Sequence, residues 1–188
     1  MGDDDVTECS REDDRDAQLM LRVARGDTGA FEQLVLRHQE RAWSFAWRYL
    51  GDAAEAEDVV QEAFLRILKA AHRYKPTSKF RTYLFTVVTR LCWDAISKKH
   101  PDYVATFPSV TDPTSNPEDL ARDRETAGLV FHALQSLPDT QRFALILRHY
   151  HDLSYEEIAQ VLSTTPKAVD SLLQRARQSL RLLLAHLK

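Results

Sequence analysis

The sequence predicts an all-α fold of two small helical domains joined by a flexible linker, with a helix-turn-helix in the C-terminal domain. Apolar residues in every strongly patterned segment recur at the helical period. No run alternates between apolar and polar residues as a half-buried strand does. The long aperiodic interior stretch, residues 101–117, contains four prolines, which is typical of a linker. The chain of 188 residues is long enough for two such domains.

These patterns also place the domain boundaries. Residues 1–15 are acidic and poor in apolar residues, so we expect a flexible tail there. The first domain is expected over residues 16–100, the linker over 101–116 and the second domain over 117–188.

In the first domain, glycine followed by aspartate marks the end of one helix and the cap of the next, at Gly26-Asp27 and at Gly51-Asp52. A further helix is expected after Pro76. The helix that follows Asp52 has its expected inward positions at Ala56, Val59, Val60, Ala63, Phe64, Ile67 and Leu68. The helix after Pro76 has them at Phe80, Tyr83, Leu84, Val87, Val88, Leu91 and Ile96.

In the second domain, Pro138 precedes a helix centred on residues 143–147. Ser154 and Glu157 have the spacing of a capping box, and Thr165 with Pro166 begins a final helix. Two helices joined by the short turn at residues 163–165 predict a helix-turn-helix. The inward positions of the final helix are expected at Val169, Leu172, Leu173, Ala176 and Leu180.

Composition excludes several functional classes. The first residues are acidic where a secretory signal would be basic and then apolar, and no apolar run has the length of a spanning helix. We therefore expect a cytoplasmic protein without direct membrane insertion. Cys9 and Cys92 lie far apart and lack neighbours at metal-ligand spacing, so neither a disulfide framework nor a metal site is expected.

The net charge of −3 conceals a partition along the chain. Residues 1–18 hold two basic and eight acidic side chains, whereas residues 19–100 hold 14 basic and nine acidic ones. Residues 131–188 are again slightly basic, with seven against five. Two basic blocks are compatible with a polyanionic partner and equally with an ordinary solvated surface, so the motifs must decide between them.

A helix-turn-helix binds duplex DNA by placing its second helix in the major groove. Cationic side chains on this helix would contact phosphates, and Ser171 or Gln174 could meet base edges. A plain helical hairpin is the alternative. The candidate DNA-contacting residues are Lys167, Asp170, Ser171, Gln174, Arg175 and Arg177.

A second candidate nucleic-acid site is the span of residues 72–99, where seven Lys or Arg side chains alternate with aromatic rings and Asp94 is the one acidic residue. Single-stranded nucleic acid is held by this mixture, because cations follow the phosphates and rings stack on unpaired bases. The alternative is that Phe80, Tyr83 and Phe85 belong to the core. Tyr74, which is expected in the loop before the helix, is the better stacking candidate.

Enzyme chemistry is not indicated. The sequence lacks a phosphate-binding glycine loop, a nucleophile elbow and a His-Glu-x-x-His pattern. His149 and His151 could suggest a metal or an acid–base pair, but alternate residues of a helix point apart, and we expect a solvated helix end. No catalytic residue, cofactor or small-molecule substrate is predicted.

Three segments resemble the sigma factors of bacterial RNA polymerase, specifically the small two-domain extracytoplasmic-function (ECF) group of the sigma-70 family. AEDVVQEAFLRI (residues 56–67) is similar to the helix that binds the polymerase clamp. SKFRTYLFTVVTR (residues 78–90) is similar to the promoter-melting segment. Residues 134–181 resemble the domain that reads the upstream promoter element, and their order and separation strengthen the resemblance.

The resemblance implies that the chain binds core RNA polymerase and promoter DNA, and makes or breaks no bond itself. Its polymerase-binding residues would be Asp58, Gln61, Glu62 and Leu65. The downstream (−10) element would be captured by Arg73, Tyr74, Lys75, Ser78, Lys79, Arg81 and Arg90, and the upstream (−35) element by the final-helix residues named above.

The sequence departs from the family pattern at four positions. Leu91 stands where the family usually has Asn, and Tyr83 where it has Trp. Asp170 lies where basic residues are usual; its carboxylate repels phosphate but can accept from a cytosine amino group. Ser163 replaces the usual glycine of the turn.

The resemblance implies an alternative sigma factor that an anti-sigma factor holds inactive. Two other functions would use part of the same chain. One is a helix-turn-helix regulator that acts without polymerase. The other is a sigma mimic that titrates an anti-sigma factor.

Overall fold

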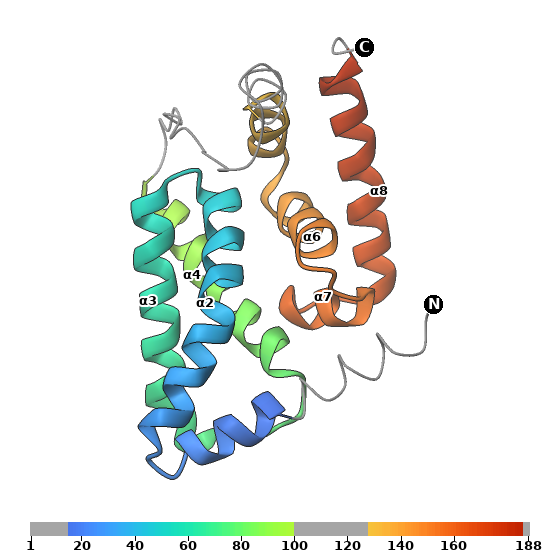
Figure 1. Cartoon of the computed structure of the whole chain (residues 1–188). Helices are drawn as coiled ribbons and strands as arrows, with labels where there is room; N and C mark the ends of the chain where they lie inside the picture. The colour runs from blue at the N-terminus through green and yellow to red at the C-terminus, as the bar shows by residue number, and fades with distance from the viewer. Residues whose placement is uncertain (1–14, 100–127, 186–188) are drawn as a thin grey trace, which may run out of the picture.

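The computed structural model describes residues 15–99 and 128–185, all of them in helices or in the turns between them (Figure 1). The acidic tail as far as residue 14 and the predicted linker lie outside these residues. Within the described ranges no strand is present, and no helix is long and apolar enough to cross a membrane.

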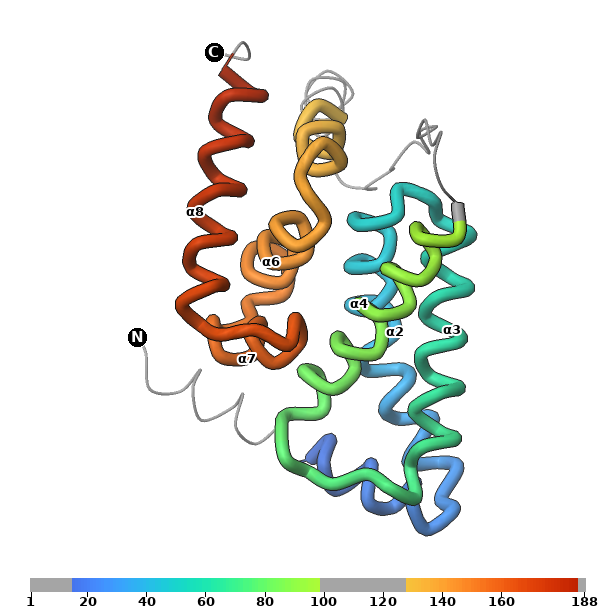
Figure 2. Tube along the Cα trace, turned by 180° about the vertical axis from the view of Figure 1, so that it is seen from behind, coloured from blue at the N-terminus to red at the C-terminus, as the bar shows by residue number. Residues whose placement is uncertain are grey.

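The first domain consists of residues 15–23 and of α2 (Thr28–Leu50), α3 (Ala53–Ala70), the 3₁₀ turn η1 (Ala71–Arg73) and α4 (Phe80–Lys99). Both predicted glycine–aspartate boundaries are confirmed. Gly26 and Gly51 have left-handed φ angles of 92° and 78°, and the carboxylates of Asp27 and Asp52 cap α2 and α3. These turns bring α2, α3 and α4 side by side (Figure 2).

Most of the inward residues that the helical pattern predicts for this domain are buried, and the exceptions are few. Every predicted inward residue of α3 is buried except Leu68, whose exposed fraction is 41%. Tyr83, Val87 and Ile96 of α4 are only partly buried. Residues 15–23 are held to α2 by Asp16, a buried carboxylate that accepts from Arg37 Nη1 at 2.7 Å and lies 2.6 Å from His38 Nε2.

The second domain consists of residues 128–135 and of α6 (Asp139–His149), α7 (Tyr155–Val161) and α8 (Pro166–Leu183). Ser154 and Glu157 form the predicted capping box at the start of α7. Thr165 caps α8, and Val169, Leu173 and Ala176 bury its inner face. The turn between α7 and α8 passes through Ser163, which adopts a left-handed φ of 52°. The position where the family usually has glycine therefore keeps the glycine-like conformation.

The two domains lie against each other and share one continuous core (Figure 1). Phe143 of α6 stacks on Tyr49 of α2 with ring centroids 3.8 Å apart. Arg142 Nη1 and Gln135 Nε2 donate to the backbone carbonyl of Tyr49, at 3.1 and 3.2 Å. These donors satisfy a carbonyl at the end of α2 that has no partner within its own helix. The helical pattern did not predict this contact.

Candidate functional site

The predicted recognition surface lies along the outer side of α8. Lys167, Ser171, Gln174 and Arg175 are exposed, opposite the side that the core buries. Ser171 Oγ donates to the Lys167 carbonyl at 3.1 Å, and Arg175 Nε donates to the Ser171 carbonyl at 3.1 Å. Arg175 is exposed as a residue, as phosphate contact requires.

Asp170 is paired with another predicted base-reading residue. Gln174 Nε2 donates to Asp170 Oδ2 at 2.9 Å, one helical turn away. The pair orients the amide and the carboxylate together, so a change at either residue alters the hydrogen-bonding pattern of both. Asp170, which stands where the family usually has a basic residue, is thus held by Gln174.

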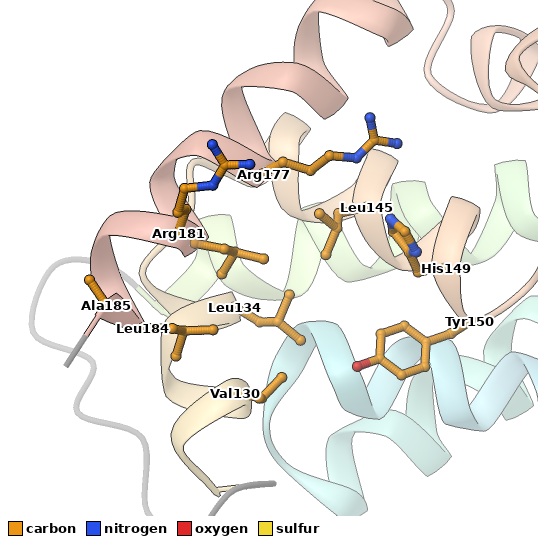
Figure 3. Close-up of a pocket in the computed structure, with 10 residues that line it drawn as sticks. Val130, Leu134, Leu145, His149, Tyr150, Arg177, Arg181, Leu184 and Ala185 are labelled. Atoms are coloured by element: carbon orange, nitrogen blue, oxygen red, sulfur yellow. The ribbon is translucent and has the colours of Figure 1, made fainter. Parts of the chain in front are cut away.

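Arg177 lies apart from the other predicted recognition residues. Together with Arg181 it borders a groove of about 660 Å³ between residues 128–135, α6 and α8 (Figure 3). The floor of the groove is apolar and is formed by Val130, Leu134, Leu145, Leu180 and Leu184. Arg177 is thus at the edge of α8, between the outer surface and this groove.

The predicted single-strand site divides into an exposed and a packed part. Arg73, Lys75 and Arg90 are exposed and Ser78 is partly exposed. Phe80 and Phe85 are buried, so the core alternative is right for these two rings. Leu91 is also buried, and the residue that replaces the family's usual Asn therefore serves packing.

Tyr74 is half-buried rather than free in the loop. Its ring lies 5.7 Å from that of Tyr83, and its hydroxyl is buried without a hydrogen-bond partner. Burial, and secondarily the neighbouring Tyr83 and Asp16, raises the pKa of the Tyr74 hydroxyl. Tyr74 and Tyr83 of α4 thus form a partly buried aromatic pair beside the basic loop, the Tyr74–Tyr83 pair.

Lys79 and Arg81 contact the second domain. Arg81 Nη2 donates to both carboxylate oxygens of Glu157, at 2.9 and 3.0 Å, and Lys79 Nζ lies 3.4 Å from Oε1. The same carboxylate accepts from the Ser154 backbone N–H at 2.7 Å. Glu157 therefore caps α7 and neutralises two cations of the predicted promoter surface.

The ionisation of Glu157 reflects these contacts. Burial alone would raise its pKa, but the Ser154 N–H, the Arg81 guanidinium and the Lys79 ammonium together lower it below its usual value. The carboxylate is charged at neutral pH, and its ion pair with Arg81 is lost only in acid.

The predicted polymerase-binding residues form one stripe on α3. Asp58, Gln61 and Leu65 are exposed, and Glu62 is partly exposed. Glu62 accepts from Arg66 Nε at 2.7 Å, and this hydrogen bond lowers the pKa of Glu62. Carboxylates beside an exposed leucine give this surface both charge and apolar area.

The α2 part of this surface was not predicted. Gln39, Glu40 and Trp43 line a hollow together with Glu57, Val60 and Gln61 of α3. Leu36 of α2 is 64% exposed, and Leu65 and Leu68 of α3 are 47% and 41% exposed. The helical period could have identified Leu36, because this leucine does not lie on the face of α2 that carries the buried residues.

The expectation of a solvated helix end at His149–Asp152 is wrong for His151. Its ring packs against two aromatic residues of the first domain that also contact each other, 5.7 Å from Phe45 and 4.8 Å from Phe85 by ring centroids. His149 and Tyr150 are exposed as expected. A loop residue that follows α6 thus belongs to the contact between the domains.

Comparisons with known proteins agree with this arrangement. Residues 34–101 match the family Sigma-70 region 2, and residues 128–180 match Sigma-70, region 4. The RNA polymerase sigma-H factor of Pseudomonas aeruginosa is 34% identical over 179 residues, which cover 89% of this chain and 92% of that protein. The ECF RNA polymerase sigma-E factor of Escherichia coli K12 is 32% identical, over 88% and 92% of the two chains.

Solved structures give the same result. CnrH in complex with the cytosolic domain of CnrY has a TM-score of 0.68 and 28% identity, covering 92% of this chain and 98% of CnrH. RpoE of Bartonella quintana, in complex with the anti-sigma factor NepR, shares the fold, with a TM-score of 0.67 at 23% identity over 82% and 96% of the chains. The chain therefore belongs to the sigma-70 family, as a non-enzymatic sigma factor of the ECF group.

Proposed function

We propose that this sigma factor binds core RNA polymerase through the α2–α3 surface, defined as Leu36, Trp43, Asp58, Gln61, Glu62 and Leu65. The observation that carries the proposal is the exposure of large apolar side chains beside carboxylates on two neighbouring helices. An exposed apolar patch with a polar surround is typical of a protein–protein interface.

The second domain reads the upstream promoter element as duplex DNA through α8. Lys167 and Arg175 contact phosphates, whereas Asp170, Ser171 and Gln174 meet base edges. On the outer side of α8, Asp170 is partly exposed and the other four residues are exposed, which supports this division. Arg177, which borders the groove beside α8, contributes a further phosphate contact at the edge of the DNA-binding surface.

The first domain captures unpaired bases of the downstream element. Arg73, Lys75 and Arg90 attract the strand, Ser78 offers a hydroxyl, and the Tyr74–Tyr83 pair is the stacking surface. Lys79 and Arg81 join this surface when they are released from Glu157. Promoter capture by the first domain therefore requires that the two domains separate.

An anti-sigma factor holds the protein inactive in the cytoplasm. This part of the proposal rests on two similar folds, CnrH with the cytosolic domain of CnrY and RpoE with the anti-sigma factor NepR. Such a partner would stabilise the packed arrangement of the domains and cover the α2–α3 surface.

Run-off transcription with purified core polymerase on a library of bacterial promoter fragments tests the function. We expect discrete transcripts that require both proteins. A sigma mimic that titrates an inhibitor, or a regulator that acts without polymerase, would give none, and that result would refute the proposal.

A further inference from the structure

His151 is an ionisable side chain placed at the apolar contact between the two domains. It follows α6, and its ring reaches Phe45 of α2 and Phe85 of α4. Its Nε2 atom is buried and has no hydrogen-bond partner. A neutral imidazole is tolerated in this position, whereas an imidazolium would be a buried charge without a counter-ion.

The charged groups around the ring add to this effect. Arg48 and Arg41, both on α2, are the cations that act on His151, and both disfavour its protonation. The side chain that α4 places against the ring is the apolar Phe85. Asp152 follows His151 in the chain but is exposed. Burial first, and then these two arginines, lowers the pKa of His151 from 6.5 to about 3.

We propose that His151 makes the contact between the domains sensitive to protons: its neutral ring packs against Phe45 and Phe85 in the closed arrangement, and its protonation in acid favours the open one. Separation of the domains returns the ring to water, where it binds a proton normally. The proposal concerns the equilibrium between closed and open chains, and so does not depend on the promoter contacts proposed above.

The direction and the pH range follow from linkage. The pKa is lower in the closed state, so closure is most stable above pH 6.5 and weakens as the pH falls below it. Between pH 7.5 and 5.5 the ratio of open to closed molecules should rise about tenfold. Glu157 titrates in a different range, because its pKa lies below the usual 4.5. A response between pH 7.5 and 5.5 therefore reports on His151 rather than on Glu157.

Single-molecule energy transfer between the domains measures this ratio. Dyes are placed on cysteines introduced at the exposed positions Glu32 and Gln178, in a chain carrying Cys9→Ser and retaining the buried Cys92. The same chain is also prepared with Glu157→Gln, which weakens closure and removes the carboxylate that pairs with Arg81. Far-UV circular dichroism at each pH measures helicity.

We expect the open population to grow about tenfold relative to the closed one between pH 7.5 and 5.5, at constant helicity. His151→Phe, which keeps an apolar ring, and His151→Leu should both abolish this response. His149→Gln, which changes an exposed histidine at the end of α6, should retain it.

Three results would overturn the proposal. They are an unchanged ratio in both the wild-type and Glu157→Gln chains, an undiminished response in the two His151 variants, and a loss of helicity that accompanies the loss of transfer. None of these results bears on promoter-specific transcription, which is measured separately with core polymerase.

Discussion

The Arg81 guanidinium of α4 donates to both carboxylate oxygens of Glu157 in α7, across 76 residues of sequence. Arg81 belongs to the predicted promoter-melting segment, and Glu157 belongs to the capping box of the helix-turn-helix. This ion pair thus connects the two domains and engages a cation of the predicted promoter surface.

Glu157→Gln should loosen this connection. Gln retains the capping-box geometry but loses the charge that holds Arg81 and Lys79. A hydrogen bond to a charged group contributes about 1.5 to 3 kcal/mol, so we expect a larger open population in the energy-transfer assay and tighter binding of a single-stranded downstream-element oligonucleotide. Ser154→Ala is the matched control, since it weakens the α7 cap without removing the Arg81 contact. Equal oligonucleotide affinity in the wild-type and Glu157→Gln chains would contradict this role.

Gly51→Ala should also open the domains. Gly51 has a left-handed φ of 78°, and a Cβ there would lie 3.2 Å from Phe131 Cζ of the second domain. Gly26→Ala is a close control, because its φ is 92° but no atom lies within 4 Å of the added Cβ. Both variants should lose roughly 1 to 2 kcal/mol of stability through backbone strain, measured by urea unfolding. Only Gly51→Ala should lower the energy transfer; similar transfer in the two variants would argue against the close approach.

Asp58→Lys combined with Glu62→Lys should abolish binding to core polymerase while the fold persists. Both side chains lie on the outer side of α3, and the Glu62–Arg66 pair is exposed, so the cost in stability is small. Asp94→Lys with Glu156→Lys makes the same change in net charge at exposed sites elsewhere. Pull-down with core enzyme, beside a thermal melt of each variant, provides the measurement. Retained binding by the α3 variant would remove this surface from the proposal.

On α8, single alanine substitutions should separate affinity from specificity. Lys167→Ala or Arg175→Ala should weaken binding to every duplex sequence and reduce the slope of log K against log salt by about 0.7 to 0.9. Gln174→Ala should instead change base preference, and because Gln174 donates to Asp170, Asp170→Ala should alter preference at the same base pairs. Binding to a randomised duplex library at several salt concentrations distinguishes the two classes. A uniform loss in all four variants would contradict the division.

Tyr74→Ala should impair transcription from both duplex and pre-melted bubble templates, at a cost of roughly 1 to 3 kcal/mol if the ring stacks on a base. Tyr74→Phe keeps the ring and removes a hydroxyl that has no partner, so it should transcribe normally and should not be less stable. The thermal melts of the two variants separate loss of packing against Tyr83 from loss of base capture. Normal transcription by Tyr74→Ala from both templates would exclude the ring from base capture.

The sequence was informative wherever structure is determined locally. Glycine–aspartate boundaries, the Ser154–Glu157 box and the Thr165 cap depend on neighbouring residues, and all are present. The helical period of α3 correctly predicted its buried side, except that Leu68 is exposed. An apolar residue at the edge of a helical stripe can serve either the core or a partner surface, and its period does not decide between them.

The contact between the domains could not be predicted in this way. Phe143 has the same helical period whether it packs within its own domain or on Tyr49, and His151 looks like any polar residue after a helix. Glu157 was recognised as a cap, but a carboxylate can accept several donors at once, and its second role depends on long-range packing. Contacts between segments that lie far apart in the sequence could therefore be identified only from the structure.

Photocrosslinking within one initiating complex tests the central claim most directly, namely that each domain reads its own promoter element on the same polymerase. A photoreactive residue is placed at Ser171 in one chain and at Lys75 in another, and each is assembled with core enzyme on a single promoter. We expect Ser171 to crosslink to the upstream duplex element, and Lys75 to the melted strand of the downstream element only when core polymerase is present. Crosslinks from both positions to the same element, or none at Lys75 in a transcribing complex, would contradict the account.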